Sequence, residues 1–234
     1  MNKIDQPTIF MLHFAGGNTY SFNPISAFLK DFNLVTPELP GRGNRMNEAL
    51  IKDFESAAED LFFQILTKPK VTEYLIFGHS MGASLAVKLA AMLENIGRPP
   101  IATVVSGNAG PGTGKKKNTY LLNPPGFRAE LEKLGGISEQ IFEHEELFGF
   151  FEPILRADFE VVQKHPLQIK SVNTPIYAIM GSEEDTVSEI SNWRKFTTAE
   201  FDYKVLPGNH FFLFDHCEKM AEIIRHCYKR YKIS

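Results

Sequence analysis

The chain has 234 residues, of which 43% are hydrophobic and 23% are charged, and its formal net charge is -3. These values are typical of one large soluble domain, and they argue against nucleic acid or an anionic membrane surface as the main partner. The sequence holds two cysteines and no apolar run near the roughly 18 residues of a membrane span, so it predicts no disulfide framework, metal centre or membrane anchor. We expect a monomeric cytoplasmic protein that needs no cofactor.

Short apolar segments rich in β-branched and aromatic residues recur along the chain. They predict strands at 8–14, 33–39, 74–78, 102–106, 175–181 and 202–206. Amphipathic stretches of helical length lie between them, among them 54–66, 84–93 and 221–231. Strands that alternate with helices form a parallel sheet covered on both faces. Since the segment before the first strand is too short for two leading strands, we expect an α/β fold with a mostly parallel sheet of six or seven strands.

The alternation stops after the fourth predicted strand. A loop, "GNAGPGTGKKKN", is followed by three helical runs, "FRAELEKLG", "EQIFEHEELFGFF" and "PILRADFEVV". We interpret residues 112–168 as a helical insertion between two core strands of a single domain, 1–234. Because open parallel sheets bind ligands at their carboxyl edge, such an insertion is placed to cover a ligand site.

The third predicted strand runs directly into "GHSMG", a Gly-x-Ser-x-Gly pattern that opens a predicted helix. This is the context of a nucleophile elbow, in which the serine is held above the sheet edge. Gly78 and Gly82 lack Cβ atoms and allow strand and helix to approach closely. A serine that only caps the helix is the alternative. The strand–turn–helix context favours Ser80 as a nucleophile.

A serine nucleophile needs a histidine base, and the sequence has seven histidines. His210 follows the last predicted strand, on a glycine-containing loop before the final helix. This is where a nucleophile–acid–base order places the base. His216 is the competitor, but it lies at the start of a helix. We predict His210 as the base.

The orienting acid is expected at the end of the strand before that, in "IYAIMGSEED". Glu183, Glu184 and Asp185 are all candidates. Asp185 is preferred because the order Ser80, Asp185, His210 puts acid and base at successive strand ends. Glu184 remains the alternative.

Two backbone amides are expected to bind the oxyanion of the reaction. One is the N–H of Met81, directly after the nucleophile. The other should come from the loop after the first strand, "HFAGGN", where we favour the N–H of Ala15, with Phe14 as the alternative.

Five segments together resemble the type II thioesterases that accompany nonribosomal peptide and polyketide synthases. They are "HFAGGNTYSF", "PELPGRGNR", "FGHSMGASLA", "ILRADFE" and "LPGNHFFL", in the family's order and nearly end to end. The resemblance implies an α/β-hydrolase fold and places the triad on Ser80, Asp185 and His210. The chain departs from the family in having Asn209 where a second glycine is usual, and in its longer acidic loop, "GSEED".

The resemblance also implies a substrate. Members hydrolyse acyl or aminoacyl groups from the phosphopantetheine arm of carrier proteins and so clear mis-primed or stalled units. The insertion would be a lid over a channel for that arm, lined by Phe148, Phe151 and Leu155. Lys115, Lys116 and Lys117 could steer an acidic acyl or peptidyl carrier protein, or they could form a solvated basic loop.

Two other functions fit the same sequence. One is a small-molecule carboxylesterase or lipase on the same fold, because fold does not fix substrate. The other is a non-catalytic module that only binds a carrier. The sequence names neither the acyl group nor the type of synthase.

Overall fold

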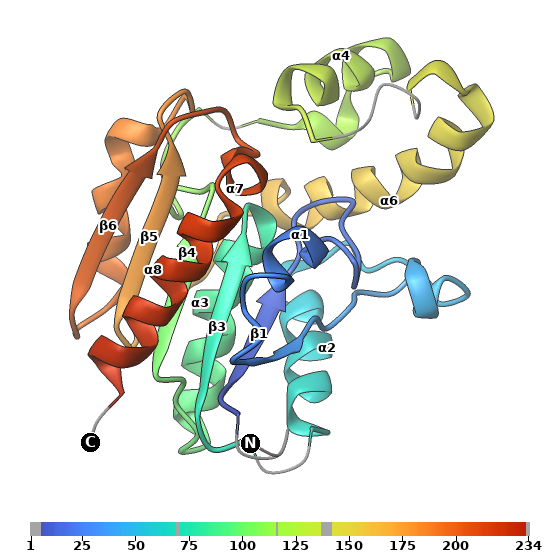
Figure 1. The fold of residues 1–234 in the computed structure, drawn as a ribbon. Helices are drawn as coiled ribbons and strands as arrows, with labels where there is room; N and C mark the ends of the chain where they lie inside the picture. The colour runs from blue at the N-terminus through green and yellow to red at the C-terminus, as the bar shows by residue number, and fades with distance from the viewer. Residues whose placement is uncertain (1–5, 69–70, 116, 137–141, 233–234) are drawn as a thin grey trace.

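The computed structural model describes residues 6–68, 71–115, 117–136 and 142–232. Its six strands form one sheet in which every neighbouring pair is parallel, in the order β2-β1-β3-β4-β5-β6 (Figure 1). The strands are β1 (Thr8–Leu12), β2 (Asn33–Val35), β3 (Tyr74–His79), β4 (Ala102–Ser106), β5 (Ile176–Gly181) and β6 (Phe201–Leu206). The predicted α/β fold with a six-stranded parallel sheet is confirmed.

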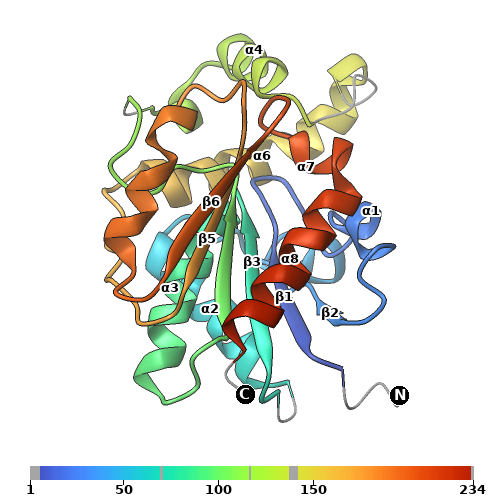
Figure 2. The same cartoon turned by 60° about the vertical axis from the view of Figure 1, so that its left-hand side comes forward.

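Helices cover both faces of the sheet, as Figure 2 shows from a second side. The α-helices are α1 (Asn23–Ser26), α2 (Phe54–Leu66), α3 (Met81–Asn95), α7 (Phe212–Asp215) and α8 (Cys217–Tyr231). Two segments form 3-10 helices, η2 (Gly43–Arg45) and η4 (Val187–Phe196). Alternate residues of a strand point to opposite faces. In β1, Ile9 and Met11 therefore pack with α1 and α8, whereas Phe10 and Leu12 pack with α2 and α3.

The predicted length of the second strand needs correction, whereas the start of the first long helix does not. The second strand was expected at 33–39 but ends at Val35; Pro37, two residues on, has no N–H to donate to a ladder. Helix α2 begins where it was predicted, at Phe54, because the side chain of Asp53 accepts from the N–H of Ser56 and caps the first turn.

The segment between β4 and β5 contains η3 (Thr119–Leu121), α4 (Pro124–Leu134) and α6 (Glu145–Gln163). We call residues 112–168 the helical insertion. In Figure 1 it lies beyond the carboxyl ends of the central strands. The sequence predicted a new helix at Pro153, but α6 continues through that residue. Pro153 has no N–H and so cannot donate to the carbonyl of Gly149, but the helix continues on both sides of it.

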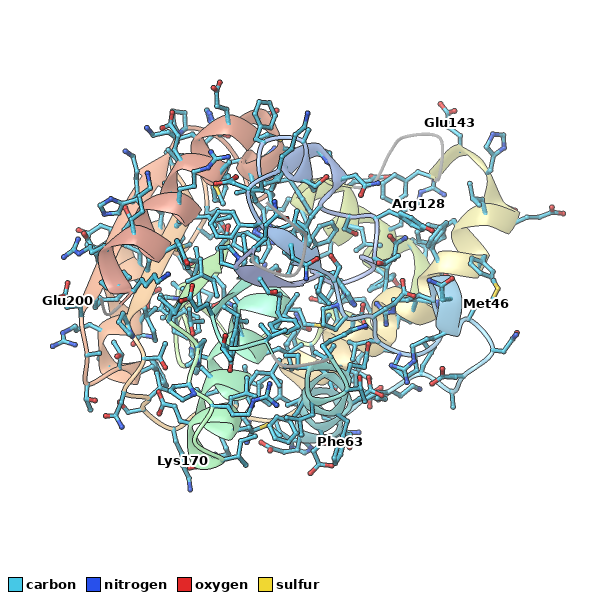
Figure 3. The ribbon with its side chains drawn as sticks, turned by 60° about the horizontal axis from the view of Figure 1, so that its bottom comes forward. Met46, Phe63, Arg128, Glu143, Lys170 and Glu200 are labelled. Carbon is cyan, nitrogen blue, oxygen red and sulfur yellow. The ribbon has the colours of Figure 1, made fainter. Side chains whose placement is uncertain are left out.

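The outer end of the insertion is held by a small aromatic cluster. Phe127, Leu131, Phe142, Phe148 and Leu155 bury one another, and the guanidinium of Arg128 lies over the rings of Phe142 and Phe148. Figure 3 shows Arg128 and Glu143 at this end, with Lys170 and Glu200 on the other side of that view. The insertion thus has a core of its own.

Candidate active site

Ser80 occupies the turn between β3 and α3 in a conformation that side chains rarely adopt. Its φ is 56°, and no other non-glycine residue in the described ranges has a positive φ. A Cβ atom on Gly78 would collide with the backbone of Gly82, and one on Gly82 would collide with the carbonyl of Leu12. The two glycines therefore permit a turn that presents the serine at the carboxyl end of β3.

Two hydrogen bonds from the neighbouring strand hold this strained serine. Its N–H donates to the carbonyl of Ser106, at 2.7 Å, and its carbonyl accepts from the side-chain amide of Asn108, at 3.1 Å. The carboxamide oxygen of Asn108 is itself fixed by the N–H of Gly110. Sequence reasoning missed Asn108, although its place two residues after β4 puts it at the same sheet edge as Ser80.

His210, in the loop between β6 and α7, connects the serine to a carboxylate. Its Nε2 lies 2.9 Å from Ser80 Oγ, and its Nδ1 lies 2.8 Å from Glu184 Oε2. A carboxylate can only accept, so Nδ1–H donates to Glu184 and leaves Nε2 to accept the hydroxyl hydrogen of Ser80. This is the geometry in which a histidine can take a proton from a serine.

The acid beside His210 is Glu184 and not the preferred Asp185. The Glu184 side chain is only 7% exposed, and its second oxygen, Oε1, accepts from the N–H of Gly181 at 2.8 Å. The Asp185 side chain is 75% exposed and only approaches Lys133, at 4.0 Å. The turn after β5 is closed by a bond from Glu183 N–H to the carbonyl of Gly208, and in this turn residue 184 faces the histidine while residue 185 faces solvent. The preference for Asp185 was wrong.

The two predicted oxyanion donors are backbone N–H groups on α3 and on the loop after β1. Met81 is the first residue of α3, where N–H groups have no partner within the helix. We call residues 14–17 the oxyanion loop. The N–H of Gly17 donates to the carbonyl of Phe14, and the N–H of Gly16 donates to Asp158. Both glycine amides are thus engaged, and the N–H of Ala15, with Phe14 as the alternative, stays a prediction as the loop's donor.

A second histidine, His79, lies beneath the first. Its ring is fully buried, its Nδ1 is 3.0 Å from Ser106 Oγ, and its centroid is 5.0 Å from that of His210. Burial, followed by the nearness of His210, holds the pKa of His79 well below its usual value. His79 therefore stays uncharged, and neither of its ring nitrogens is hydrogen-bonded to the Ser80 hydroxyl.

The predicted channel residues lie in two settings. Phe148 packs inside the aromatic cluster of the insertion, and Phe151 lies half-buried against that cluster. Leu155 contacts Gly16, so the insertion reaches the oxyanion loop directly. On the other side of the site, Gly136 of the insertion contacts Phe211, the residue after the histidine base. The helical insertion thus covers the site, and the channel itself remains a prediction.

The three lysines predicted to dock a carrier protein have different surroundings. Lys115 is exposed. Lys117 is paired with Glu130, at 2.8 Å, which offsets its charge. Lys116 lies outside the described residues. The role of the three in docking a partner remains a prediction.

A strained serine, a histidine and a buried carboxylate at the carboxyl edge of a parallel sheet define the class of α/β-hydrolases. In the part of the chain that the structure describes, no three acidic, cysteine or histidine side chains gather as metal ligands. Nor does any described helix combine the length and apolarity needed to cross a membrane.

Residues 7–230 match the family model of the thioesterase domain, and the chain belongs to this family. It is 31% identical to the probable cadicidin biosynthesis thioesterase of Streptomyces griseus over 87% of the chain, and it spans 57% of that relative's length. The structure superposes on ClbQ from the colibactin pathway with a TM-score of 0.89, at 25% identity, covering 97% of this chain and 99% of ClbQ. It superposes on the type II thioesterase BorB from the borrelidin cluster with a TM-score of 0.86, at 29% identity, covering 96% and 93% of the two chains.

Proposed function

We propose that this protein hydrolyses acyl and aminoacyl thioesters on the phosphopantetheine arm of carrier proteins, and so clears mis-primed or stalled units from a nonribosomal peptide or polyketide synthase. The observation that carries the proposal is the continuous hydrogen-bonded chain from Glu184 through His210 to Ser80. Membership of the thioesterase family supports thioesters as the substrate class. The likeness to ClbQ, which comes from a nonribosomal peptide/polyketide pathway, and to BorB, a type II thioesterase, supports the carrier-bound form.

The first half of the reaction acylates Ser80. His210 Nε2 takes the hydroxyl proton while Oγ attacks the thioester carbonyl, and the carbonyl oxygen becomes an oxyanion. In this proposal the amides of Met81 and Ala15 donate to that oxyanion. When the intermediate collapses, the carbon–sulfur bond breaks, and His210 returns the proton to the leaving thiol of the phosphopantetheine arm.

The second half releases the acyl group. A water molecule gives a proton to His210 and attacks the acyl carbon, and the new intermediate collapses with Ser80 Oγ as the leaving group. His210 then returns that proton to the serine, which leaves a free carboxylic acid and the original enzyme. In both halves Glu184 holds the imidazole in the productive tautomer and stabilises its charged form. The carboxylate is itself oriented by the N–H of Gly181.

The competing function is hydrolysis of small free esters by the same triad. The two are separated by presenting one acyl group in three forms: on a phosphopantetheinylated carrier protein, on a short pantetheine-like thiol, and as a free oxygen ester. Ser80→Ala serves as the blank for each form. We expect the carrier-bound form to give the highest kcat/KM. A higher kcat/KM for the free oxygen ester would contradict the proposal and favour an esterase.

A binding module without catalysis is the third possibility. Labelling of the folded protein by a fluorophosphonate, which reacts only with an activated serine, tests it. We expect stoichiometric labelling that disappears in Ser80→Ala. Folded wild-type protein that does not label would contradict a catalytic role.

A further inference from the structure

A fully buried ion pair lies directly behind the oxyanion loop. Arg42 and Asp158 are 116 residues apart in sequence and form two parallel hydrogen bonds of 2.6 and 2.7 Å. The Arg42 side chain is 4% exposed and that of Asp158 is 0% exposed. Arg42 comes from "PGRGNR", before α2, and Asp158 comes from α6. Nothing in the hydrolytic steps above uses either charge.

Both partners also bind the backbone of the loop. Asp158 Oδ2 accepts from the N–H of Gly16 at 2.7 Å, and Arg42 Nη1 donates to the carbonyl of Gly17 at 3.3 Å. The bond from Gly17 N–H to the carbonyl of Phe14, at 2.9 Å, closes the turn between them. Gly16, with φ 77°, supplies the left-handed residue that this turn requires. The bonds to the Phe14 carbonyl and from the Gly16 N–H therefore fix the peptide planes on either side of Ala15, and the bond from Arg42 holds the end of the turn at Gly17.

A buried ion pair contributes little net stability, because the cost of desolvating two charges offsets their attraction. Removing two ions from water costs several kcal/mol each, and apolar replacements of similar volume are often neutral or stabilising. What a bidentate pair does supply is fixed geometry. The positive charge of Arg42 also acts on His13, which precedes the loop. Burial first and Arg42 second lower the pKa of His13 to about 4, so His13 stays uncharged at neutral pH.

We propose that Arg42 and Asp158 are positioning residues for the reaction: they hold the oxyanion loop so that the Ala15 N–H points at the developing oxyanion. We call Arg42, Asp158 and the Gly16 N–H the clamp. The inference rests on the proposed hydrolytic function. Because Asp158 lies on α6, one turn from Leu155 and its contact with Gly16, the clamp also joins the helical insertion to the oxyanion hole.

Two double variants separate positioning from packing. In Arg42→Met/Asp158→Leu both charges and the acceptor for Gly16 are lost. In Arg42→Met/Asp158→Asn both charges are lost, but the side-chain amide oxygen can still accept from Gly16. Neither variant leaves an unpaired charge in the core. The matched control is Asp60→Asn, which breaks another bidentate pair, with Arg45 of the same segment, that does not touch the oxyanion loop.

The measurement is turnover per competent serine. Fluorophosphonate labelling to its end point counts the active sites, and kcat and KM for a short acyl thioester are then referred to that count. We expect the Leu double variant to lose roughly 10- to 100-fold in kcat with little change in KM, since one oxyanion donor is worth about 10²–10³-fold. The Asn double variant should recover most of that loss, and Asp60→Asn should match wild type. The pH–rate profile should keep its shape, because His210 and Glu184 are untouched.

The proposal is overturned if the two double variants turn over equally per counted serine, or if their kcat follows their melting temperatures. The rate of fluorophosphonate labelling gives the same comparison without any acyl thioester. Slow labelling in the Leu variant alone would therefore support the clamp even if carrier-bound thioesters prove not to be substrates. Equal labelling rates in wild type and both double variants would contradict it.

Discussion

The carboxyl edge of the sheet and the helical insertion are held in place by different means. At the sheet edge, each reactive side chain follows a strand, and backbone hydrogen bonds between neighbouring segments hold the turns, as between Ser80 and Ser106 and between Glu183 and Gly208. The insertion has an aromatic cluster of its own, and it meets the site through Gly136, Leu155 and the buried carboxylate of Asp158. The sheet edge therefore determines the chemistry, whereas the insertion is free to determine which substrate reaches it.

The largest effect should come from the nucleophile. Ser80→Ala removes one hydroxyl from a half-buried turn, so the fold and the melting temperature should stay close to those of wild type. Thioester hydrolysis should fall by about 10⁶-fold, as it does when other triad serines are removed. Steady-state assays with circular dichroism as the folding control check this. Turnover near the wild-type rate would show that Ser80 is not the nucleophile and that the reaction takes place elsewhere.

The next largest effect tests the corrected acid. Glu184→Gln leaves a neutral amide beside His210 and should lower kcat by about 10⁴-fold, the loss seen when a triad carboxylate becomes an amide. Asp185→Asn is the matched control on the next residue. Because its side chain faces solvent, it should stay within about twofold of wild type. The reverse order of effects would restore Asp185 to the triad.

This pair also shows what the sequence could and could not predict. Ser80 and His210 were located because each belongs to a motif tied to a strand end. Glu184 and Asp185 differ only in which side of a turn they occupy, and that turn is closed by a hydrogen bond to Gly208 on another loop. The pairing of Arg42 with Asp158 is likewise non-local. Local patterns predict the strands and the nucleophile, but contacts between distant loops decide which of two adjacent acids faces inward.

The cluster of the insertion can be broken without touching the sheet. Phe148 is buried in it, and a buried phenylalanine truncated to alanine typically costs about 3–5 kcal/mol. Because the insertion has its own core, Phe148→Ala should open it locally, and limited proteolysis should cut within 112–168 faster than in wild type. The matched control is Phe150→Ala on the same helix, where the side chain is 53% exposed. Equal sensitivity of the two variants, or cuts spread along the whole chain, would show that the insertion does not open separately.

At the sheet edge, the buried His13 should make the free energy of unfolding depend on pH. Burial and the charge of Arg42 lower the pKa of His13 to about 4, and Asp158 and Glu38 oppose the shift only in part. Between pH 4 and 6.5 the unfolded chain binds a proton at His13 that the folded chain does not. The free energy of unfolding should therefore rise with pH across this window, and His13 should account for about 3 kcal/mol of the rise.

Urea unfolding at several pH values from 4.5 to 7 checks this. His13→Asn should flatten the slope by up to about 1.4 kcal/mol per pH unit. Some slope should remain, because burial also lowers the pKa of His79 and acts with the same sign. His144→Asn, at an exposed position of the insertion, is the control and should leave the slope as it is. A slope that is the same in wild type and His13→Asn would mean that His13 titrates alike in both states.

The smallest effect concerns the surface at which a carrier protein would approach the insertion. Lys117 is already paired with Glu130, so Lys115 is the better probe among the described lysines of this loop. If an acidic partner docks here, Lys115→Glu should raise KM for a carrier-bound substrate by roughly two- to fivefold at low salt and by less at high salt.

Two controls test whether this effect is specific to a carrier protein. KM for a short acyl thioester without a carrier should be unchanged. Lys170→Glu makes the same change of net charge at an exposed lysine that Figure 3 shows far from Arg128 and Glu143, and it should alter neither value. If the two lysine variants behave alike, or if the short thioester responds as strongly as the carrier-bound one, the partner meets a different surface and the basic loop is only solvated.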